Sequence, residues 1–371
     1  AIDNQGGSLV SQNLLNLIAS SLNNANGGTL ASRNGLSLLL SGALNNSGDG
    51  LIHSELGALA IRAQSLNNNG GTLSSQQDLS LNLDAELNNQ GGHIQSQAGN
   101  LDLQKSSAVD NSAGVLSSLQ GWLKLVTAGL FDNDAGTTQA QSVEIDAKGL
   151  DNRGGHISAL SGDTVIDSGS AAFNNQGGGL YAHQLLDLIA GSFNNQGAAP
   201  GQGGKVAAGQ IDFSLDEALR NGYGILESAS TLNLAAASLD NQFGSLRALG
   251  SSGDTRIAAS SLDNRNGTIE TANRNLDLNV ASLQSSGGSI LHVGTGNFGL
   301  SAAQVTGAGG DLSTNGLLTL TADSWTNSGV LQAGQLVINI GNFTQTTSGQ
   351  LLAGNSFTGS GNNWVNHGLL A

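Results

Sequence analysis

The sequence contains no cysteine and no methionine, and it has a single proline among 371 residues. Without cysteine the chain has no disulfide, no thiolate metal site and no cysteine nucleophile. Abundant glycine with almost no proline excludes collagen, which needs proline and a strict three-residue period. No apolar run approaches the 18 or more residues of a membrane-spanning helix. We therefore expect no disulfide scaffold, no collagen-like fold and no membrane insertion.

Aromatic and charged side chains are also scarce, at 4% and 11% of the residues. Hydrophobic residues still make up 38%, and most are Leu, Ile, Val and Ala. We therefore expect a core of stacked aliphatic side chains that is too narrow for aromatic rings. The charge is unbalanced, because 27 acidic and 12 basic residues give a formal net charge of -15. This acidity argues against nucleic acid and anionic membrane surfaces as partners.

A three-residue signature recurs along the chain: an apolar residue, usually Asp or Asn next, and then Asn. It begins at positions 2, 22, 44, 66, 87, 109, 131, 150, 173, 193, 219, 239 and 262. Beyond residue 283 it decays to Trp-Thr-Asn at 325, Phe-Thr-Gln at 343 and Trp-Val-Asn at 364, while the spacing of about 20 residues persists. A fixed period of this length predicts a repeat architecture. We predict one domain over residues 1–371, with regular coils in 1–282 and degenerate coils in 283–371.

Each repeat contains short stretches in which apolar and polar residues alternate. In residues 262–282, Thr268–Thr271 alternates after a Gly-containing turn, and Leu276, Leu278 and Val280 then fall on one side. Alternation with period two between Gly and Asn turns indicates short strands. So small a unit buries its apolar face only by stacking on its neighbours. We predict an all-β fold, a single-stranded right-handed parallel β-helix of about 17–18 coils with roughly 20–22 residues each.

The third residue is Asn in all thirteen copies that begin between residues 2 and 262, and a tight corner explains why. Asn tolerates the left-handed conformation better than other non-Gly residues, and its amide bonds the backbone of turns. Identical Asn side chains stacked at the strand spacing also bond one another as an amide ladder. The predicted ladder consists of Asn4, Asn24, Asn46, Asn68, Asn89, Asn111, Asn133, Asn152, Asn175, Asn195, Asn221, Asn241 and Asn264.

The order of Asn corner, Gly-Gly turn and Leu-x-Leu strand, as in residues 66–85 and 87–104, resembles the haemagglutinin repeats of filamentous-haemagglutinin-like exoproteins. That family includes adhesins and contact-dependent growth-inhibition effectors exported by two-partner secretion. The resemblance covers essentially the whole chain and is clearest in residues 1–282. It implies an outer-membrane two-partner-secretion transporter as a partner, and folding on the bacterial cell surface into a β-helical stalk. It also implies a receptor on a host or neighbouring bacterial cell.

This resemblance implies a structural stalk or adhesin segment of a large secreted or cell-surface exoprotein, which projects an adhesive or toxin module toward another cell. Both ends of the sequence lack the amphipathic cap that an isolated solenoid needs, so we expect an excerpt of a longer chain. The alternative is a carbohydrate-binding or polysaccharide-cleaving β-helix, which fold analogy alone supports. A groove lined by acidic and aromatic residues would favour that alternative.

Acidic and histidine residues are the candidates for chemistry in this sequence. The signature Asp residues share one corner position with Asn, which marks them as turn formers: Asp3, Asp110, Asp132, Asp151, Asp240 and Asp263. His93 and His156 share a repeat position three coils apart, about 14 Å at the strand spacing. That separation is too large for binding one ion, so we interpret both as surface strand residues. We expect no catalytic, cofactor-binding or metal site and no enzyme activity.

The longest repeat unit begins at Phe193, and its extra residues fall at 198–204 around Pro200. We predict that this insertion projects as a loop. Such a loop is either a neutral surface insertion or a place where a solenoid contacts its partner.

A second departure appears when the unit from Val109 is aligned with the unit from Leu262. Leu119, Trp122 and Val126 then fall on corner or outward positions. Exposed apolar side chains at these positions would form a partner-contact site. The alternative is a widened coil that buries the Trp122 ring.

Overall fold

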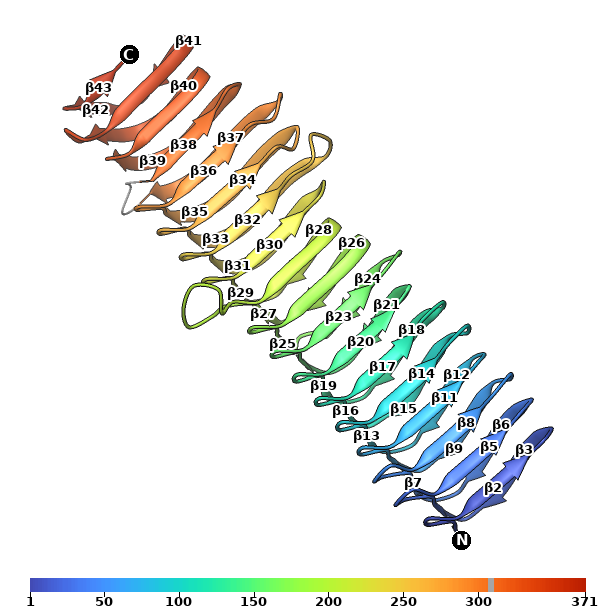
Figure 1. Ribbon diagram of the computed structural model, residues 1–371. Coiled ribbons are helices and arrows are strands. Elements are labelled where there is room, and N and C mark those ends of the chain that lie inside the picture. The colour runs from blue at the N-terminus through green and yellow to red at the C-terminus, as the bar shows by residue number, and fades with distance from the viewer. Residues whose placement is uncertain (306–309) are drawn as a thin grey trace. The chain divides into compact units, whose positions relative to one another are not determined.

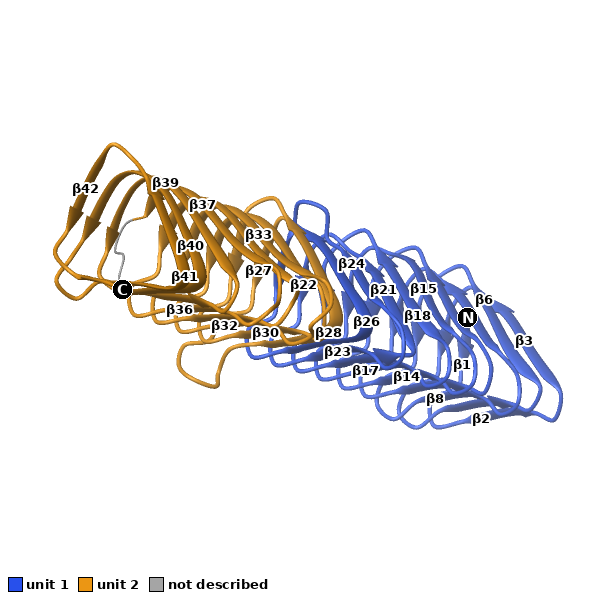
Figure 2. Ribbon diagram, turned by 90° about the horizontal axis from the view of Figure 1, so that it is seen from above, with its two compact units in different colours: residues 1–190 blue, residues 191–371 orange. Residues whose placement is uncertain are grey.

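The computed structural model describes residues 1–305 and 310–371, and the regular structure in them is all β-strand. These residues divide into two compact units, Ala1–Ala190 and Gly191–Ala371, coloured separately in Figure 2. Within each unit the strands pair in parallel, one coil upon the next (Figure 1). The two units together contain about 17 turns, and the predicted parallel β-helix is confirmed. Residues 306–309, within the predicted degenerate coils, lie outside the described residues.

Each coil of unit 1 contributes one strand to each of three parallel rows, which we name A, B and C. Row A is formed by β1 (Ile2–Asp3), β4 (Leu22–Asn23), β7 (Leu44–Asn45), β10 (Leu66–Asn67), β13 (Leu87–Asn88), β16 (Val109–Asp110), β19 (Phe131–Asp132), β22 (Leu150–Asp151) and β25 (Ala172–Asn174). These strands are the shortest of the three rows, because the signature Asn turns the chain directly after them.

Rows B and C of unit 1 follow in each coil, separated by a polar corner. Row B is formed by β2 (Ser8–Ser11), β5 (Thr29–Ser32), β8 (Leu51–Ser54), β11 (Thr72–Ser75), β14 (His93–Ser96), β17 (Val115–Ser118), β20 (Thr137–Ala140), β23 (His156–Ala159) and the start of β26 (Gly179–Ala190). Row C is formed by β3 (Leu14–Ala19), β6 (Gly35–Leu40), β9 (Leu59–Ala63), β12 (Leu79–Leu83), β15 (Leu101–Ser106), β18 (Trp122–Thr127), β21 (Ser142–Asp146), β24 (Thr164–Asp167) and the end of β26.

Unit 2 has the same three rows, but its strands often run through a corner. Row A alone is formed by β27 (Ser192–Asn194), β29 (Ala218–Arg220) and β42 (Asn363–Asn366), and row B alone by β30 (Ile225–Ser228), β32 (Ser245–Ala248), β34 (Thr268–Thr271), β36 (Ser289–His292), β38 (Asp311–Thr314) and β43 (Leu369–Leu370). The strands that serve two or three rows are β28 (Lys205–Leu215), β31 (Leu232–Asp240), β33 (Asp254–Asp263), β35 (Asn275–Gln284), β37 (Asn297–Val305), β39 (Leu317–Asn327), β40 (Val330–Gln345) and β41 (Gln350–Ser360).

The register places equivalent residues of successive coils side by side. In row C, Leu79 and Leu81 of β12 pair with Leu101 and Leu103 of β15, and all four side chains are buried. Within each strand, the residue between the two leucines points outward, as the period-two pattern requires. Burial of one such Leu side chain contributes about 1.5–3 kcal/mol, so the stacked aliphatic rows are the main source of stability.

The expectation of a core too narrow for aromatic rings is wrong. The fully buried side chains include Phe131 and Phe173 in unit 1, and Phe193, Phe213 and Phe298 in unit 2. In row A, Phe131 pairs with Val109 of one neighbouring coil and with Leu150 of the other. A ring fits here because its neighbours along the row are smaller, so the row stays close-packed.

The thirteen signature Asn residues are buried at the corner after row A, with Asn4 8% exposed and the others 0%. In unit 1, from Asn4 to Asn175, each Nδ2 donates to the Oδ1 of the next Asn at 2.7–2.8 Å. In unit 2 the same bonds run at 2.8 Å from Asn195 to Asn264. The Asn68 Nδ2 also donates to the Gly71 carbonyl at 3.1 Å, so one amide stabilises its own turn and joins two coils.

The Gly-Gly pair that follows the Asn has two separate causes. Gly70 has a φ of +62°, a left-handed conformation that glycine adopts without steric cost. A Cβ at Gly71 would collide with the backbone carbonyl of Asn46 in the preceding coil. The first glycine therefore makes the turn, and the second lets neighbouring coils approach closely.

Candidate partner-contact surfaces

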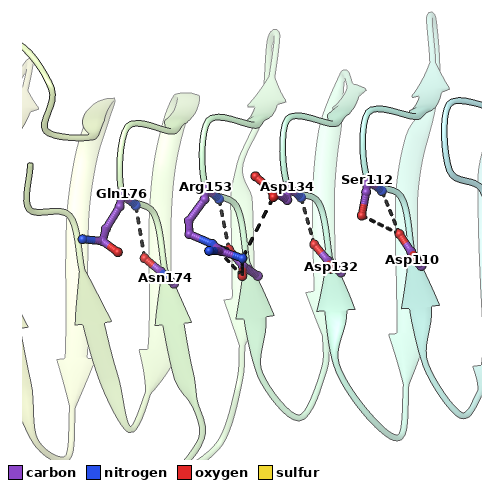
Figure 3. Close-up of polar contacts among 8 residues, drawn as sticks. Asp110, Ser112, Asp132, Asp134, Arg153, Asn174 and Gln176 are labelled. Carbon is purple, nitrogen blue, oxygen red and sulfur yellow. Dashed lines mark hydrogen bonds and ion pairs between the residues drawn. The ribbon is translucent and has the colours of Figure 1, made fainter.

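The middle residue of the signature starts the turn at each corner. The Asp132 Oδ1 accepts a hydrogen bond from the Asp134 backbone N–H at 3.0 Å (Figure 3). The Asn174 Oδ1 accepts the same bond from Gln176 at 3.2 Å. Because Asp and Asn make one and the same contact, this position selects a side-chain oxygen for the turn rather than a charge.

Stacking brings several of these carboxylates close together in unit 1. The pKa of Asp132 is raised, chiefly by burial and further by the negative charges of Asp110, Asp151 and Asp134, while the hydrogen bond from the Asp134 N–H opposes the shift. Arg153 offsets part of this charge, since its guanidinium pairs with Asp151 at 2.8 Å and with Asp134 at 4.0 Å. The middle residues of the signature, stacked coil upon coil, form a row that we name the turn row. The raised pKa of Asp132 therefore has a structural cause in this row.

His93 and His156 lie at the starts of β14 and β23 and are exposed. Strands β17 and β20 separate them, so they lie three coils apart within unit 1. Among residues 1–305 and 310–371, no group of three or more His, Asp or Glu side chains is arranged to hold a metal ion. The described part of the chain also contains no helix long and apolar enough to cross a membrane.

Trp122 is the first residue of β18, and its side chain is 41% exposed. The next residue, Leu123, pairs with Leu101 and Val143 in row C and is fully buried. Because successive strand residues point to opposite faces, a buried Leu123 directs Trp122 outward. The structure therefore places the indole on the surface, and the coil does not widen to bury it.

A hollow of about 470 Å³ lies beside Trp122 on three successive row C coils. Its lining includes Ser142 and Glu144 of β21, and Asp163 and Val165 of the next coil. Ser142 pairs with Trp122 in the register of β18 and β21. The small Ser142 side chain next to the large indole leaves the surface hollow at this point.

Leu119 and Val126 do not line this hollow. Leu119 lies at the corner before β18 and is 42% exposed, whereas Val126, near the end of β18, is only half-buried. Of the three apolar residues that the alignment singled out, Trp122 alone therefore lines the hollow. The acidic residues of the next two coils, which complete it, were missed because sequence alignment of one unit does not show which outward residues adjoin between coils.

Pro200 lies in a loop between β27 and β28 that projects from the stack in both views (Figures 1 and 2). The Asn195 Nδ2 donates to the Gly204 carbonyl nine residues later, whereas the equivalent bond of Asn68 spans three residues. The six extra residues are therefore inserted within a normal turn, whose two ends still meet. Pro200 is exposed.

Tyr223 and Phe243 form a second surface feature, beside this loop, that the sequence analysis missed. Their rings stack with centroids 5.0 Å apart and an interplanar angle of 7°. Both have a positive φ, 59° and 57°, which is unusual for a bulky side chain, and Phe243 is 49% exposed. In unit 1 the same turn position holds glycine or a small residue, such as Ala113. The sequence does contain a signal for this pair, because an aromatic residue stands at a turn position that holds glycine or a small residue in unit 1.

The haemagglutinin-repeat family model matches this chain in five segments, residues 1–48, 56–135, 206–252, 248–298 and 293–342. No curated protein and no solved structure matches it. The matched segments include both regular coils and most of the coils in which the Asn signature decays. Since the match spans more than half of the sequence and its segments coincide with stacked coils, the chain belongs to the haemagglutinin-repeat family and is a filamentous-haemagglutinin-like repeat region.

Proposed function

We propose that this chain is a stalk segment of a large adhesin-like exoprotein, secreted or held on the bacterial surface, that projects an adhesive or toxin module toward another cell. The observation that supports the proposal most directly is the haemagglutinin-repeat match on coils stacked in register. Each added coil extends such a stack by one strand spacing, about 4.8 Å. The nine coils of unit 1 alone correspond to about 40 Å along the stacking direction.

The contacts between coils suit a stiff spacer. Neighbouring coils are joined by backbone ladders on three rows, by buried Leu rows and by the Asn amide ladder. Because each coil contacts only its neighbours, coils can be added or removed without changing the packing of distant ones. Length is therefore the property that this architecture adjusts most easily.

The proposal includes two partners that the family suggests. One is an outer-membrane two-partner-secretion transporter, and the other is a receptor on a host or neighbouring bacterial cell. The absence of cysteine means that no disulfide could form before or during export of an unfolded chain. The single domain predicted over residues 1–371 remains part of this proposal.

Deletion of whole coils in the full-length natural protein tests the spacer function. Removal of residues 46–110 joins Asn45 to Asn111 in register and shortens unit 1 by three coils, about 14 Å. We expect retained surface display, measured with antibodies on intact cells, together with a graded loss of contact with target cells. Removal of residues 46–100 breaks the register and is the matched control that should abolish display.

Three results would contradict the proposal. Complete loss of target binding by a displayed, folded in-register deletion would show that the segment itself contains the binding site. Display without the transporter would exclude two-partner secretion. Unchanged contact after serial removal of coils would show that reach is not the function.

The stacked pair of half-buried Tyr223 and exposed Phe243 is the observation that favours the alternative, a carbohydrate-binding or polysaccharide-cleaving β-helix. Sugar rings pack their apolar faces on aromatic side chains, and Pro200 lies in the adjoining loop. A glycan array combined with a turnover assay separates the alternatives, because an adhesin binds without forming product. Loss of a glycan signal in Phe243→Ala but not in Leu119→Ala would assign it to this pair.

A further inference from the structure

The hollow at Trp122 differs from the ordinary surface of the stack in having an aromatic wall. Trp122 of β18, Glu144 of β21, and Asp163 and Val165 of the following coil surround a volume of about 470 Å³. Trp122 is 41% exposed and Val165 36% exposed. The half-buried Ser142 forms part of the lining between the indole and Asp163. This space accommodates one long side chain that lies along the indole and ends at Asp163.

The charge around the hollow is predominantly negative. Glu144 and Asp163 line it, and Asp102 and Asp146 lie on the same outward face of row C, opposite Lys124 and Val126 in the strand register. Lys124 is the cation in the lining, and its ammonium already bonds the Glu144 carboxylate at 2.7 Å. This leaves Asp163 without an ion-pair partner among the described residues.

Asp163 is held in place for binding. Its Oδ1 accepts a hydrogen bond from the Leu185 backbone N–H at 2.9 Å, which fixes the carboxylate and leaves its second oxygen and one lone pair of Oδ1 available. The pKa of Lys124 is raised, first by its hydrogen bond and charge attraction to Glu144 and further by Asp102 and Asp146. The same face therefore already stabilises one positive charge of the chain itself.

We propose that this hollow receives an arginine side chain from an exposed basic segment of a partner protein. The guanidinium stacks on the Trp122 indole and pairs with the Asp163 carboxylate, while the aliphatic stem contacts Val165. Arginine fits better than lysine because its planar group both stacks on aromatic faces and bonds a carboxylate through two N–H groups. The inference goes beyond the spacer function, since a stalk needs no such site.

Titration with N-acetylarginine amide tests the proposal on the intact chain. 5-Fluorotryptophan gives one ¹⁹F resonance each for Trp122, Trp325 and Trp364, which Trp→Phe substitutions assign. We expect a saturable shift of the Trp122 resonance only, and a weaker response at higher salt concentration. N-acetylcitrulline amide, which has nearly the same shape and no charge, should give little or no shift.

Matched variants locate the binding groups. Asp163→Asn should weaken the apparent affinity for the arginine probe by about fivefold or more, because a charge-assisted bond is lost. Glu86→Gln, an exposed acid outside the hollow, should leave the affinity unchanged. For Trp122→Ala, ligand-detected NMR replaces the missing resonance and should show lost binding, whereas Leu119→Ala should bind normally.

Three outcomes would overturn the proposal. Equal shifts with arginine and citrulline probes would show that charge is not recognised. A Trp122 response to methyl glucosides but not to arginine would identify a sugar site instead. Unchanged affinity in Asp163→Asn, with the fold verified by circular dichroism, would remove the carboxylate from the site.

Discussion

Two regions of unit 2 build the same corner with different side chains. From Asn195 to Asn264 the corner is an amide ladder, in which each Nδ2 donates to the next Oδ1. At Gln345 the side-chain amide donates to the carbonyls of Gly349 and Leu369, but its Oε1 accepts no hydrogen bond from residues 1–305 and 310–371. The ladder therefore does not continue through that coil, although its backbone pairing does.

Aromatic rings fill row A of the C-terminal coils. Trp325 pairs with Phe343 in row A, and Phe343 pairs with Trp364. Trp325 and Phe343 are buried, and the Phe343 and Trp364 rings lie 5.2 Å apart. In the earlier coils the same row contains Leu219, Leu239 and Leu262. The comparison shows that a coil without the Asn ladder keeps its place through backbone pairing and a packed row A.

The largest effect should come from removing an aromatic ring of the C-terminal coils. We expect Phe343→Ala to lower the free energy of unfolding by about 3–5 kcal/mol, because it leaves a cavity in a close-packed row. Urea unfolding measures the loss, and hydrogen exchange should show increased opening in residues 330–371.

Phe243→Ala is the matched control for that substitution. Its ring is 49% exposed, and Ala113 already occupies the equivalent left-handed turn position in unit 1. We expect a change below about 1 kcal/mol, as is usual away from buried contacts. Equal losses in the two variants would contradict the assignment of stability to the aromatic row.

Breaking the amide ladder should have the next largest effect. Asn68→Ala removes the bond to the Asn89 Oδ1 at 2.7 Å and leaves buried polar groups without partners. We expect a loss of about 1–3 kcal/mol, measured by urea unfolding. The neighbouring Asn69 is exposed, and among the described residues its side chain bonds only Gln90, so Asn69→Ala should change stability by less than about 0.5 kcal/mol. A ladder without energetic importance would give the same small value at both positions.

Extending the ladder should stabilise the first degenerate coil. Ser285 occupies the position after Asn264, and its buried Oγ has no hydrogen-bond partner among the described residues. Ser285→Asn would offer an Oδ1 to the Asn264 amide and should raise the free energy of unfolding by about 1 kcal/mol. Ser286→Asn, one residue further, is the control. Destabilisation by Ser285→Asn would mean that this corner is too narrow for an amide.

The smallest effect concerns charge in the turn row of unit 1. Because the pKa of Asp132 is raised in the folded chain, folding becomes less favourable as the pH rises from the ordinary Asp range through that raised value. Asn cannot ionise and keeps the turn bond, so Asp132→Asn should gain a few tenths of a kcal/mol at pH 7 and nothing at pH 3.

Asp151→Asn provides the contrast in the same row. Its carboxylate pairs with Arg153 at 2.8 Å, so the substitution should be neutral or slightly destabilising at pH 7. Thermal melts at pH 3 and pH 7 distinguish the two variants. A gain of the same size in both would show that only the total charge matters.

The sequence by itself determined the structure within one coil. Its period, the turn at each Asn and the inward face of each strand depend on residues close together in the chain. The expected strand at Thr268–Thr271 is β34 with the same bounds. These features are local because alternation and turn chemistry act within one coil.

Only the tertiary structure decided what happens between coils. It accommodated Phe131 beside Val109 and Leu150, and it placed Trp122 beside the small Ser142 and near Asp163. It also stacked Tyr223 on Phe243. These contacts join residues one or two coils apart, about 20 or 40 positions along the chain, and their fit depends on the sizes of side chains in neighbouring coils. A pattern within one repeat contains no information about that fit, because packing is a property of the assembled rows.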